Sequence, residues 1–285
     1  MNKVAVIGAG RLGTTLGHAL LKKGYTITAL SCRSLSAAKK SAQIIGKGIP
    51  GTDNKEATIK ADIVAITVPD DRIKYVVNEL RPIDLNQKFI FHCSGILSSE
   101  ILKPLKKSGA VTACIHPIQS FSVKSRNPML FKDIYFSVEG DKKAQQLANK
   151  IIKKLGGTGF SIDPKDKPLY HTACTMASNY LVVLLELAEN LLGKAGVKKE
   201  IQNRMLLPLV KGTLNNISKN GIPGSLTGPI SRGDIKTLKS HLNCLKNHPS
   251  FLRIYQDLAQ QALEIAKKEN RLPQKKITEI KALLE

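Results

Sequence analysis

The sequence contains no tryptophan, six tyrosines and seven phenylalanines among its 285 residues, so its core must be built mainly from aliphatic side chains. Hydrophobic residues make up 42% of the chain and charged residues 23%, which is the composition of a globular protein and excludes a disordered one. The chain is longer than a single hydrophobic core usually supports, so we expect two domains.

Cysteine is scarce and shows no pairing pattern. The five cysteines form no Cys-x-x-Cys pair, which argues against a disulfide framework and against a zinc site. We therefore expect a reducing compartment and no metal. No signal-peptide pattern precedes the first apolar run, and the longest uncharged stretch, residues 168–185, contains imidazole, hydroxyl and amide groups. A buried helix fits that stretch better than a membrane span, so we expect a cytoplasmic protein with no membrane partner.

Acidic residues are half as numerous as basic ones, 22 against 44, which leaves a formal net charge of +22. Such an excess is typical of proteins that bind nucleic acid. Here the charge is spread along the chain, +13 over residues 1–163 and +9 over residues 164–285, and no nucleic-acid-binding motif accompanies it. A lysine-rich surface accounts for most of this charge, and steering of a small anionic ligand is compatible with it. We expect no nucleic-acid partner.

A dinucleotide-binding pattern opens the chain. Residues 4–7 are a continuous apolar run, as in a strand that is buried on both faces, and residues 8–13 read Gly-Ala-Gly-Arg-Leu-Gly before a helical pattern. In this G-x-G-x-x-G motif, Gly8 permits a tight turn, Gly10 lets the backbone approach a pyrophosphate, and Gly13 allows close packing of helix on strand. The amino end of the helix attracts the phosphate charge.

The end of the second predicted strand, residues 25–30, indicates which cofactor is bound. An acidic residue there would hold the ribose 2′-hydroxyl of NAD, but the sequence places Arg33 between hydroxyl side chains. A guanidinium is suited to a 2′-phosphate, so we expect NADP(H). The predicted cofactor-binding residues are Gly8, Gly10, Arg11, Leu12, Gly13, Ser31, Arg33, Ser34, Val68, Pro69 and Ser94.

Further apolar runs predict strands at residues 63–68, 89–91, 111–115, 134–138 and 159–162, and the pattern turns helical after Asp163. We therefore predict an α/β protein in which a Rossmann-type, doubly wound, mostly parallel sheet over residues 1–163 is followed by an all-α domain over residues 164–285. Ligands of such sheets bind beyond the carboxyl ends of the strands. Ser94 and His116 follow two of the predicted strands and are expected at that edge.

The helical half carries two polar features. On a helical wheel, one arc holds Lys167, His171, Cys174, Thr175, Ser178 and Asn179. Buried polar groups need partners, so this stripe either satisfies itself and neighbouring helices or faces the cofactor cleft. Residues 222–234, rich in glycine and proline, predict a defined loop whose only charges are Arg232 and Asp234.

Taken together, these motifs resemble the bacterial Rossmann-like and DUF2520 oxidoreductases, relatives of the 6-phosphogluconate dehydrogenase and ketopantoate reductase superfamily. The resemblance covers nearly all of the chain and is carried by residues 8–13, 92–95, 116–121, 170–171, 178–179 and 227–234. It implies a homodimer formed through the helical domain and reduction of a small anionic keto acid, with ketopantoate to D-pantoate as the leading candidate. Hydroxyacid dehydrogenases of the superfamily place an asparagine four residues after their catalytic lysine, whereas this chain has His171 four residues after Lys167.

The expected mechanism follows from hydride transfer to a carbonyl, whose oxygen gains negative charge and must then be protonated. His171 is the leading proton donor because imidazole titrates near neutral pH, and Lys167 is the second candidate. Arg232 offers a planar clamp for a carboxylate, and Asp234 would either orient it or contact a hydroxyl of the substrate. The remaining predicted site residues are Asn179 in the catalytic group and Ser94, His116 and Ser178 at the substrate.

Two other functions stay open at this point. One is a non-catalytic NADPH-binding sensor that controls a partner. The other is a reductase of a different ketone or an imine, although the helical-domain signatures of pyrroline reductases are absent from this sequence.

Overall fold

The computed structural model describes residues 1–285 and divides into two compact units, Met1–Asn179 and Tyr180–Glu285. Helix α7 (Lys167–Lys194) begins in the first unit and continues into the second. The domain boundary expected after Asp163 therefore falls just ahead of α7, whereas the compact units divide within that helix.

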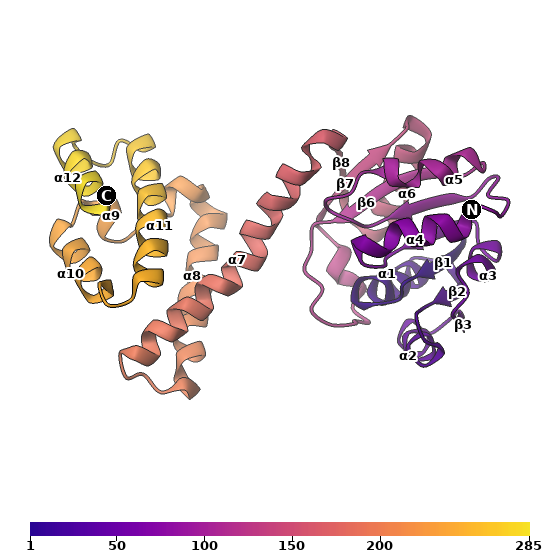
Figure 1. Cartoon of the computed structure of the whole chain (residues 1–285), viewed down its shortest axis with the longest axis horizontal. Coiled ribbons are helices and arrows are strands. Elements are labelled where there is room, and N and C mark those ends of the chain that lie inside the picture. Colours follow the sequence, from indigo (N-terminus) through magenta and orange to yellow (C-terminus); the bar gives the residue numbers. More distant parts are fainter. The chain divides into compact units, whose positions relative to one another are not determined.

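A single eight-stranded sheet organises the first unit, with strand order β3-β2-β1-β4-β5-β6-β7-β8 (Figure 1). Every neighbouring pair is parallel except β6 and β7, and the order of the first six strands is that of a dinucleotide-binding fold. This confirms the predicted mostly parallel Rossmann-type sheet. The strands are β1 (Lys3–Ile7), β2 (Thr26–Ser31), β3 (Ile49–Gly51), β4 (Ile63–Ile66), β5 (Phe89–His92), β6 (Val111–Pro117), β7 (Tyr135–Gly140) and β8 (Thr158–Ser161).

Helices cover both faces of this sheet because its strands are apolar on both sides. Val4 and Val6 of β1 belong to one core cluster with α1 and α6, and Ile7 belongs to a second cluster with α4 and α5. The helices of this unit are α1 (Arg11–Lys22), α2 (Leu35–Ile45), α3 (Asn54–Ile59), α4 (Asp70–Leu80), α5 (Lys103–Lys107) and α6 (Lys142–Leu155), with 3-10 turns at Ser99–Leu102, Pro128–Phe131 and Pro164–Asp166.

The second unit is entirely helical, as predicted. Besides the end of α7 it contains α8 (Lys199–Gly224), α9 (Pro229–Arg232), α10 (Ile235–Leu245), α11 (Pro249–Lys268) and α12 (Gln274–Leu284). Its small core joins Ile230, Leu238, Leu263 and Ile280 from four of these helices. None of the helices in the protein combines the length and the hydropathy needed to cross a membrane.

The segment predicted as a loop, residues 222–234, contains helix. The backbone breaks at Gly221, where φ is 73°, the last turn of α8 follows, and α9 occupies residues 229–232. Gly233, with φ of 66°, ends α9, and Asp234 caps α10. The glycines therefore mark the ends of short helices, so the prediction of a continuous loop was wrong.

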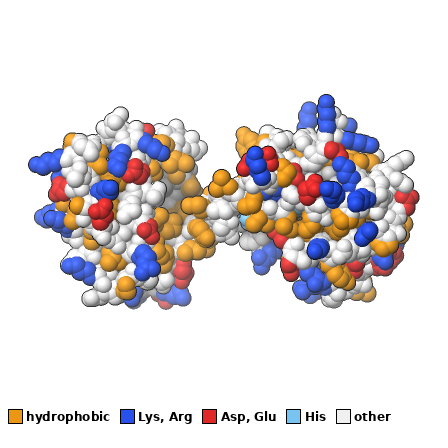
Figure 2. Space-filling view, turned by 45° about the horizontal axis from the view of Figure 1, so that its top comes forward, with side chains coloured by type: hydrophobic (Ala, Val, Ile, Leu, Met, Phe, Trp, Pro, Cys, Tyr) orange, Lys and Arg blue, Asp and Glu red, His pale blue; other side chains and the backbone are white.

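Basic side chains are dispersed over the surface. On the face drawn in Figure 2, Lys and Arg side chains (blue) alternate with acidic and apolar ones and form no single block. Several lysines pair with nearby carboxylates on the surface, among them Lys106 with Asp141 at 2.9 Å. The dispersal agrees with the spread of charge along the sequence.

Candidate functional site

The turn between β1 and α1 leaves backbone exposed at one glycine and is closely packed at two. Gly8 has φ of +84°, and a Cβ there would lie 2.5 Å from Val68 Cγ1. A Cβ on Gly13 would lie 2.7 Å from the carbonyl oxygen of Gly8. At Gly10, by contrast, the nearest atom to a Cβ would be that same oxygen at 3.8 Å. Gly10 is therefore the position open to a ligand.

The amino end of α1 is suited to an anion. Gly10 provides no side-chain cap, so the first backbone N–H groups of α1, at Arg11 and Leu12, are free to donate. The first turn also carries no acidic side chain. This arrangement fits the pyrophosphate of a dinucleotide.

The carboxyl end of β2 lies beside this turn and carries no carboxylate. The Ser31 carbonyl accepts a hydrogen bond from the Gly8 N–H at 2.8 Å, and Ser34 Oγ caps α2 by accepting from the Ala37 N–H at 3.2 Å. Arg33 is exposed and takes part in no ion pair. Val68 packs against Gly8 after β4, and the next residue, Pro69, occupies the N-cap position of α4. These residues fit a dinucleotide whose adenosine ribose carries a phosphate.

A row of polar side chains crosses the sheet from β5 to β7. The strand register places His92 opposite Cys114, Cys114 opposite Glu139, and His116 opposite Ser137. Directly opposite residues point to the same face of a sheet, so these five side chains share one face. Only His116 is partly exposed, while Ser137 Oγ and Glu139 Oε2 are buried without a hydrogen-bond partner. Such a concentration of buried polar groups is typical of a functional site.

Lys167, the first residue of α7, is completely buried against this row. Its Nζ donates to Cys114 Sγ at 3.2 Å and to the Ser94 carbonyl oxygen at 3.4 Å, and no carboxylate pairs with it. Burial raises the pKa of Cys114 to about 11 although Lys167 lowers it, so the thiol keeps its proton. The lysine therefore brings a buried nitrogen donor without a carboxylate partner into the site.

Two imidazoles meet above Gly95. The rings of His116 and His171 lie edge to face with centroids 5.9 Å apart. A Cβ on Gly95 would lie 2.9 Å from His116 Nε2 and 3.0 Å from His171 Nε2. The two rings therefore pack directly over Gly95, where a Cβ would collide with the His171 ring.

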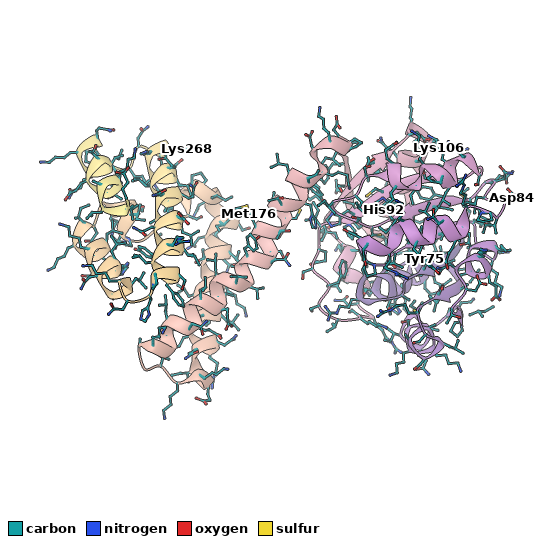
Figure 3. All side chains as sticks on the ribbon, in the orientation of Figure 1. Tyr75, Asp84, His92, Lys106, Met176 and Lys268 are labelled. Atoms are coloured by element: carbon teal, nitrogen blue, oxygen red, sulfur yellow. The ribbon has the colours of Figure 1, made fainter.

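Burial keeps two of the three site histidines neutral. It lowers the pKa of His92 to about 4, although the hydrogen bond to the Ser98 carbonyl raises it, and Lys167 lowers it further. Burial also lowers the pKa of His116 to about 4, followed by the charges at Lys167, His171 and His92. His92 is labelled in Figure 3. Its Nδ1 accepts the Ser94 N–H at 3.2 Å, which holds the turn after β5 in place.

Four predicted site residues come together here: Ser94, His116, Lys167 and His171. Ser94 is buried, and its Oγ accepts from the Leu97 N–H at 2.9 Å and the Ile96 N–H at 3.3 Å, which leaves its own O–H free to donate. Lys167 and His171 are one turn apart on α7, so the first two residues of the predicted polar stripe lie on the same face of the helix.

Other predicted residues lie elsewhere. Ser178 and Asn179 are exposed on α7, about 10 to 12 Å farther along the helix than His171. Arg232 and Asp234 belong to the second unit, where Arg232 is exposed and Asp234 caps α10 by accepting from the Thr237 N–H at 3.1 Å and the Thr237 hydroxyl at 2.7 Å. These substrate contacts stay predictions, and the observed work of Asp234 is helix capping.

Sequence reasoning missed Tyr170, Cys114, Ser137 and Glu139 as members of the site. Polar residues at alternate positions of an otherwise apolar strand were a signal for Ser137 and Glu139, but their partners become visible only through the antiparallel pairing of β6 and β7. Tyr170 enters because its hydroxyl lies 2.7 Å from His116 Nδ1.

Comparisons with known proteins match both halves of the chain. A Rossmann-like domain model matches residues 1–117, and the domain of unknown function DUF2520 matches residues 134–262. A curated relative, the NAD(P)+ glycerol-3-phosphate dehydrogenase of Chlorobium limicola, is 21% identical over 266 residues, which cover 86% of this chain and 75% of that protein.

Solved structures extend the likeness over almost the whole chain. Protein TM1727 of Thermotoga maritima is 30% identical, with a TM-score of 0.73 and coverage of 94% of this chain and 99% of that one. A proposed NADP oxidoreductase of Bacteroides fragilis is 23% identical, with a TM-score of 0.77 over 92% of this chain and 98% of that one. The pyrroline carboxylate reductase of Plasmodium falciparum, solved with NADP bound, is 18% identical, with a TM-score of 0.61 over 94% and 97% of the chains.

The fold and the open glycine turn define the class: the chain has the architecture of NAD(P)-dependent oxidoreductases, dehydrogenases and reductases alike. Within that class it belongs to the family of the Thermotoga protein, and it consists of a Rossmann-like domain joined to a DUF2520 domain.

Proposed function

We propose that the protein is an NADPH-dependent reductase that converts the carbonyl of a small anionic keto acid into a hydroxyl, with ketopantoate to D-pantoate as the leading reaction. One observation carries the proposal. Lys167, His116 and His171 gather around Ser94 and Gly95, just after β5, on the sheet edge that also holds the open Gly10 turn.

Strand order supports this position for the reacting end of the cofactor. In dinucleotide folds one half of the sheet carries each half of the cofactor, and the two halves meet where the strand order reverses. Here β1–β3 hold the Gly10 turn and Arg33, so the other half of the cofactor would bind at β4–β6. Ser94 follows β5, and His116 lies near the end of β6. The bound cofactor would supply a hydride there.

The protein's own residues would stabilise the negative charge on the carbonyl oxygen and supply its proton. A carbonyl oxygen that receives a hydride at carbon becomes an alkoxide and takes up one proton. His171 packs over Gly95 beside His116 and is the leading donor of that proton, with Lys167 as the second candidate. The free Ser94 hydroxyl would hold the substrate, and the positive environment of Lys167 favours an anionic one.

The preference for NADPH rests on Arg33. It is exposed at the end of β2, free of any ion pair and without a neighbouring carboxylate, and a 2′-phosphate would accept its planar fork of donors.

A screen of purified protein for NADPH oxidation, with ketopantoate and then other 2-keto acids, tests the reaction. We expect turnover of at least one of them, and in His171→Ala a fall in kcat of roughly a hundredfold, the scale for loss of a general acid. His248→Ala, in the second unit, is the matched control and should keep full activity. An unchanged rate in His171→Ala would transfer the proton-donor role to Lys167.

If no 2-keto acid is reduced, the proposed substrate class is wrong and two alternatives gain support. A reductase of another ketone or of an imine is the first, because the fold is shared with a pyrroline carboxylate reductase. Turnover of cyclic imines in the same assay would identify it. The second is a non-catalytic NADPH sensor, which would bind the cofactor and reduce none of these compounds.

We also propose a homodimer formed by the helical unit. Within that unit, large apolar side chains stand exposed on α7 and α8, including Val182 at 68% and Leu209 at 66% exposure. Apolar surface of this kind is usually covered by another chain. Sedimentation equilibrium measures the state, and a monomer at micromolar concentration would contradict the proposal.

A further inference from the structure

The hydrogen bond between Tyr170 and His116 has a direction that follows from its surroundings. The phenol oxygen lies 2.7 Å from Nδ1, and the two rings are edge to face at 5.6 Å. Phe160 packs against Tyr170 with ring centroids 6.0 Å apart. The phenol is thus held between a ring of the site and an aromatic side chain of β8.

Tyr170 is the donor in this pair. Burial raises the pKa of the phenol far above its usual range, so it keeps its proton throughout the neutral range. Cys174, one turn farther along α7, offers only a weak thiol acceptor, whereas an unprotonated imidazole nitrogen is a strong one. The buried hydroxyl of Ser137 is next to the phenol, has no partner of its own, and can donate to the phenol oxygen.

The groups that face His116 all oppose a positive charge on its ring. Lys167 and His171 on α7 and His92 on β5 each lower its pKa, after burial, which is the largest cause. The ring is therefore neutral and carries one proton. Since Nδ1 accepts from Tyr170, that proton is on Nε2, which has no hydrogen-bond partner in the protein and lies over Gly95.

We propose that Tyr170 positions His116 as a neutral imidazole that donates a hydrogen bond from Nε2 to the carbonyl oxygen of the bound substrate. A neutral donor aimed at a developing oxyanion stabilises it without giving up a proton, which leaves protonation to His171 or Lys167. The inference rests on the proposed function for the identity of the acceptor atom. It assigns Tyr170 a positioning role that its sequence position does not reveal.

The tautomer can be measured without any substrate. In NADPH-bound protein labelled with nitrogen-15 at histidine, two-bond nitrogen–proton correlation spectra distinguish a ring protonated at Nε2 from one protonated at Nδ1. We expect an Nε2-protonated, neutral His116 at pH 7, with its signals assigned by their loss in His116→Gln. A ring protonated at Nδ1, or a doubly protonated ring at pH 7, would overturn the proposal.

Tyr170→Phe removes the hydroxyl and keeps the ring. We expect His116 to lose its single tautomer in the same spectra, and kcat for the keto acid reduced fastest in the screen to fall roughly tenfold, the scale of one hydrogen bond. The KM for NADPH should stay within about twofold of wild type, because the adenosine half of the cofactor binds elsewhere. Tyr75→Phe, an exposed tyrosine on α4, is the matched control (Figure 3).

Replacing His116 by Gln and by Asn distinguishes a hydrogen-bond donor at Nε2 from a packing role. The terminal NH2 of Gln reaches the place of imidazole Nε2, whereas that of Asn reaches only the place of Nδ1. His116→Gln should therefore retain more activity than His116→Asn, in which we expect a loss of roughly a hundredfold, the scale for one oxyanion donor. Equal activity in the two variants, or an unchanged kcat in Tyr170→Phe, would refute the donor role.

The proposed reductase function and the proposed role of Tyr170 can be disproved independently. If no keto acid or imine is turned over, the reductase is wrong and so is a donor role toward a substrate carbonyl. The tautomer in the spectra still decides whether Tyr170 positions His116. If turnover is found with His116 protonated at Nδ1, the reductase stands and this inference falls.

Discussion

Single residues at this site act through what surrounds them. His116 and His171 have the same side chain, but His116 lies beside Lys167 and is hydrogen-bonded to Tyr170, while His171, on α7, has no hydrogen bond to the protein. One is thereby suited to donate a hydrogen bond and the other to exchange a proton. Gly95 contributes by its missing side chain, since a Cβ there would collide with the His171 ring.

Arg33 is the residue on which the cofactor preference should depend. In Arg33→Ala we expect the KM for NADPH to rise roughly tenfold or more, because a hydrogen bond to a charged group contributes about 1.5 to 3 kcal/mol. The KM for NADH should not change. Steady-state kinetics with both cofactors measures this, and Arg81→Ala, exposed at the end of α4, serves as control. Equal efficiency of NADH and NADPH in the wild type would contradict the assignment.

At the scale of elements, the β1–α1 turn combines two kinds of glycine that a sequence motif treats alike. Gly8 and Gly13 are required for packing, because a side chain at either would collide with Thr67 or Val68, just after β4, or with the turn itself. Gly10 is required only for a ligand, since its surroundings are open. The same motif therefore serves both the packing of α1 on β1 and the approach of the pyrophosphate.

Alanine at Gly13 and alanine at Gly10 should affect different properties of the protein, stability in the first case and NADPH binding in the second. Gly13→Ala should lower the free energy of unfolding by about 1 to 3 kcal/mol, the usual cost of overpacking. Gly10→Ala should leave stability unchanged and weaken NADPH binding, because φ at Gly10 is −75° and the new Cβ would point into the ligand space. Urea denaturation and NADPH fluorescence titration measure the two effects. Tight NADPH binding by Gly10→Ala would show that the pyrophosphate lies elsewhere.

At the scale of the whole molecule, the first unit carries its site inside its own core. His92, Cys114 and Glu139 are buried in the sheet that holds the unit together, so the protonation of the site and the stability of the fold are linked. His92 has a folded-state pKa of about 4 against an ordinary value of 6.5. The unfolded chain therefore binds a proton in this window that the folded chain does not.

The free energy of unfolding should consequently be at its full value above pH 6.5 and should fall as the pH drops from 6.5 toward 4. The loss due to His92 reaches up to about 3 kcal/mol at the lower end. Urea denaturation at about pH 7 and about pH 4.5 measures the change, and His92→Gln should reduce the dependence on pH. Stability that increases on acidification across this range would contradict a buried neutral His92.

Local patterns determined much of this protein from the sequence alone. Apolar runs located seven of the eight strands, the glycine spacing located the cofactor turn, and the helical period after Asp163 located the all-α region. The strand Ile49–Gly51 escaped because three residues, one of them proline, show no period. These features are local because neighbouring residues along the chain decide them.

Only the tertiary structure decided which polar residues meet. Strand pairing joined His92, Cys114 and Glu139, residues far apart in sequence, and the first turn of α7 brought Lys167, Tyr170 and His171 onto that row. The same structure placed Ser178 and Asn179 on an exposed stretch of α7 and gave Asp234 the work of a helix cap. The reason is physical: period and spacing report the face on which a side chain lies, whereas long-range pairing and burial decide what that face touches.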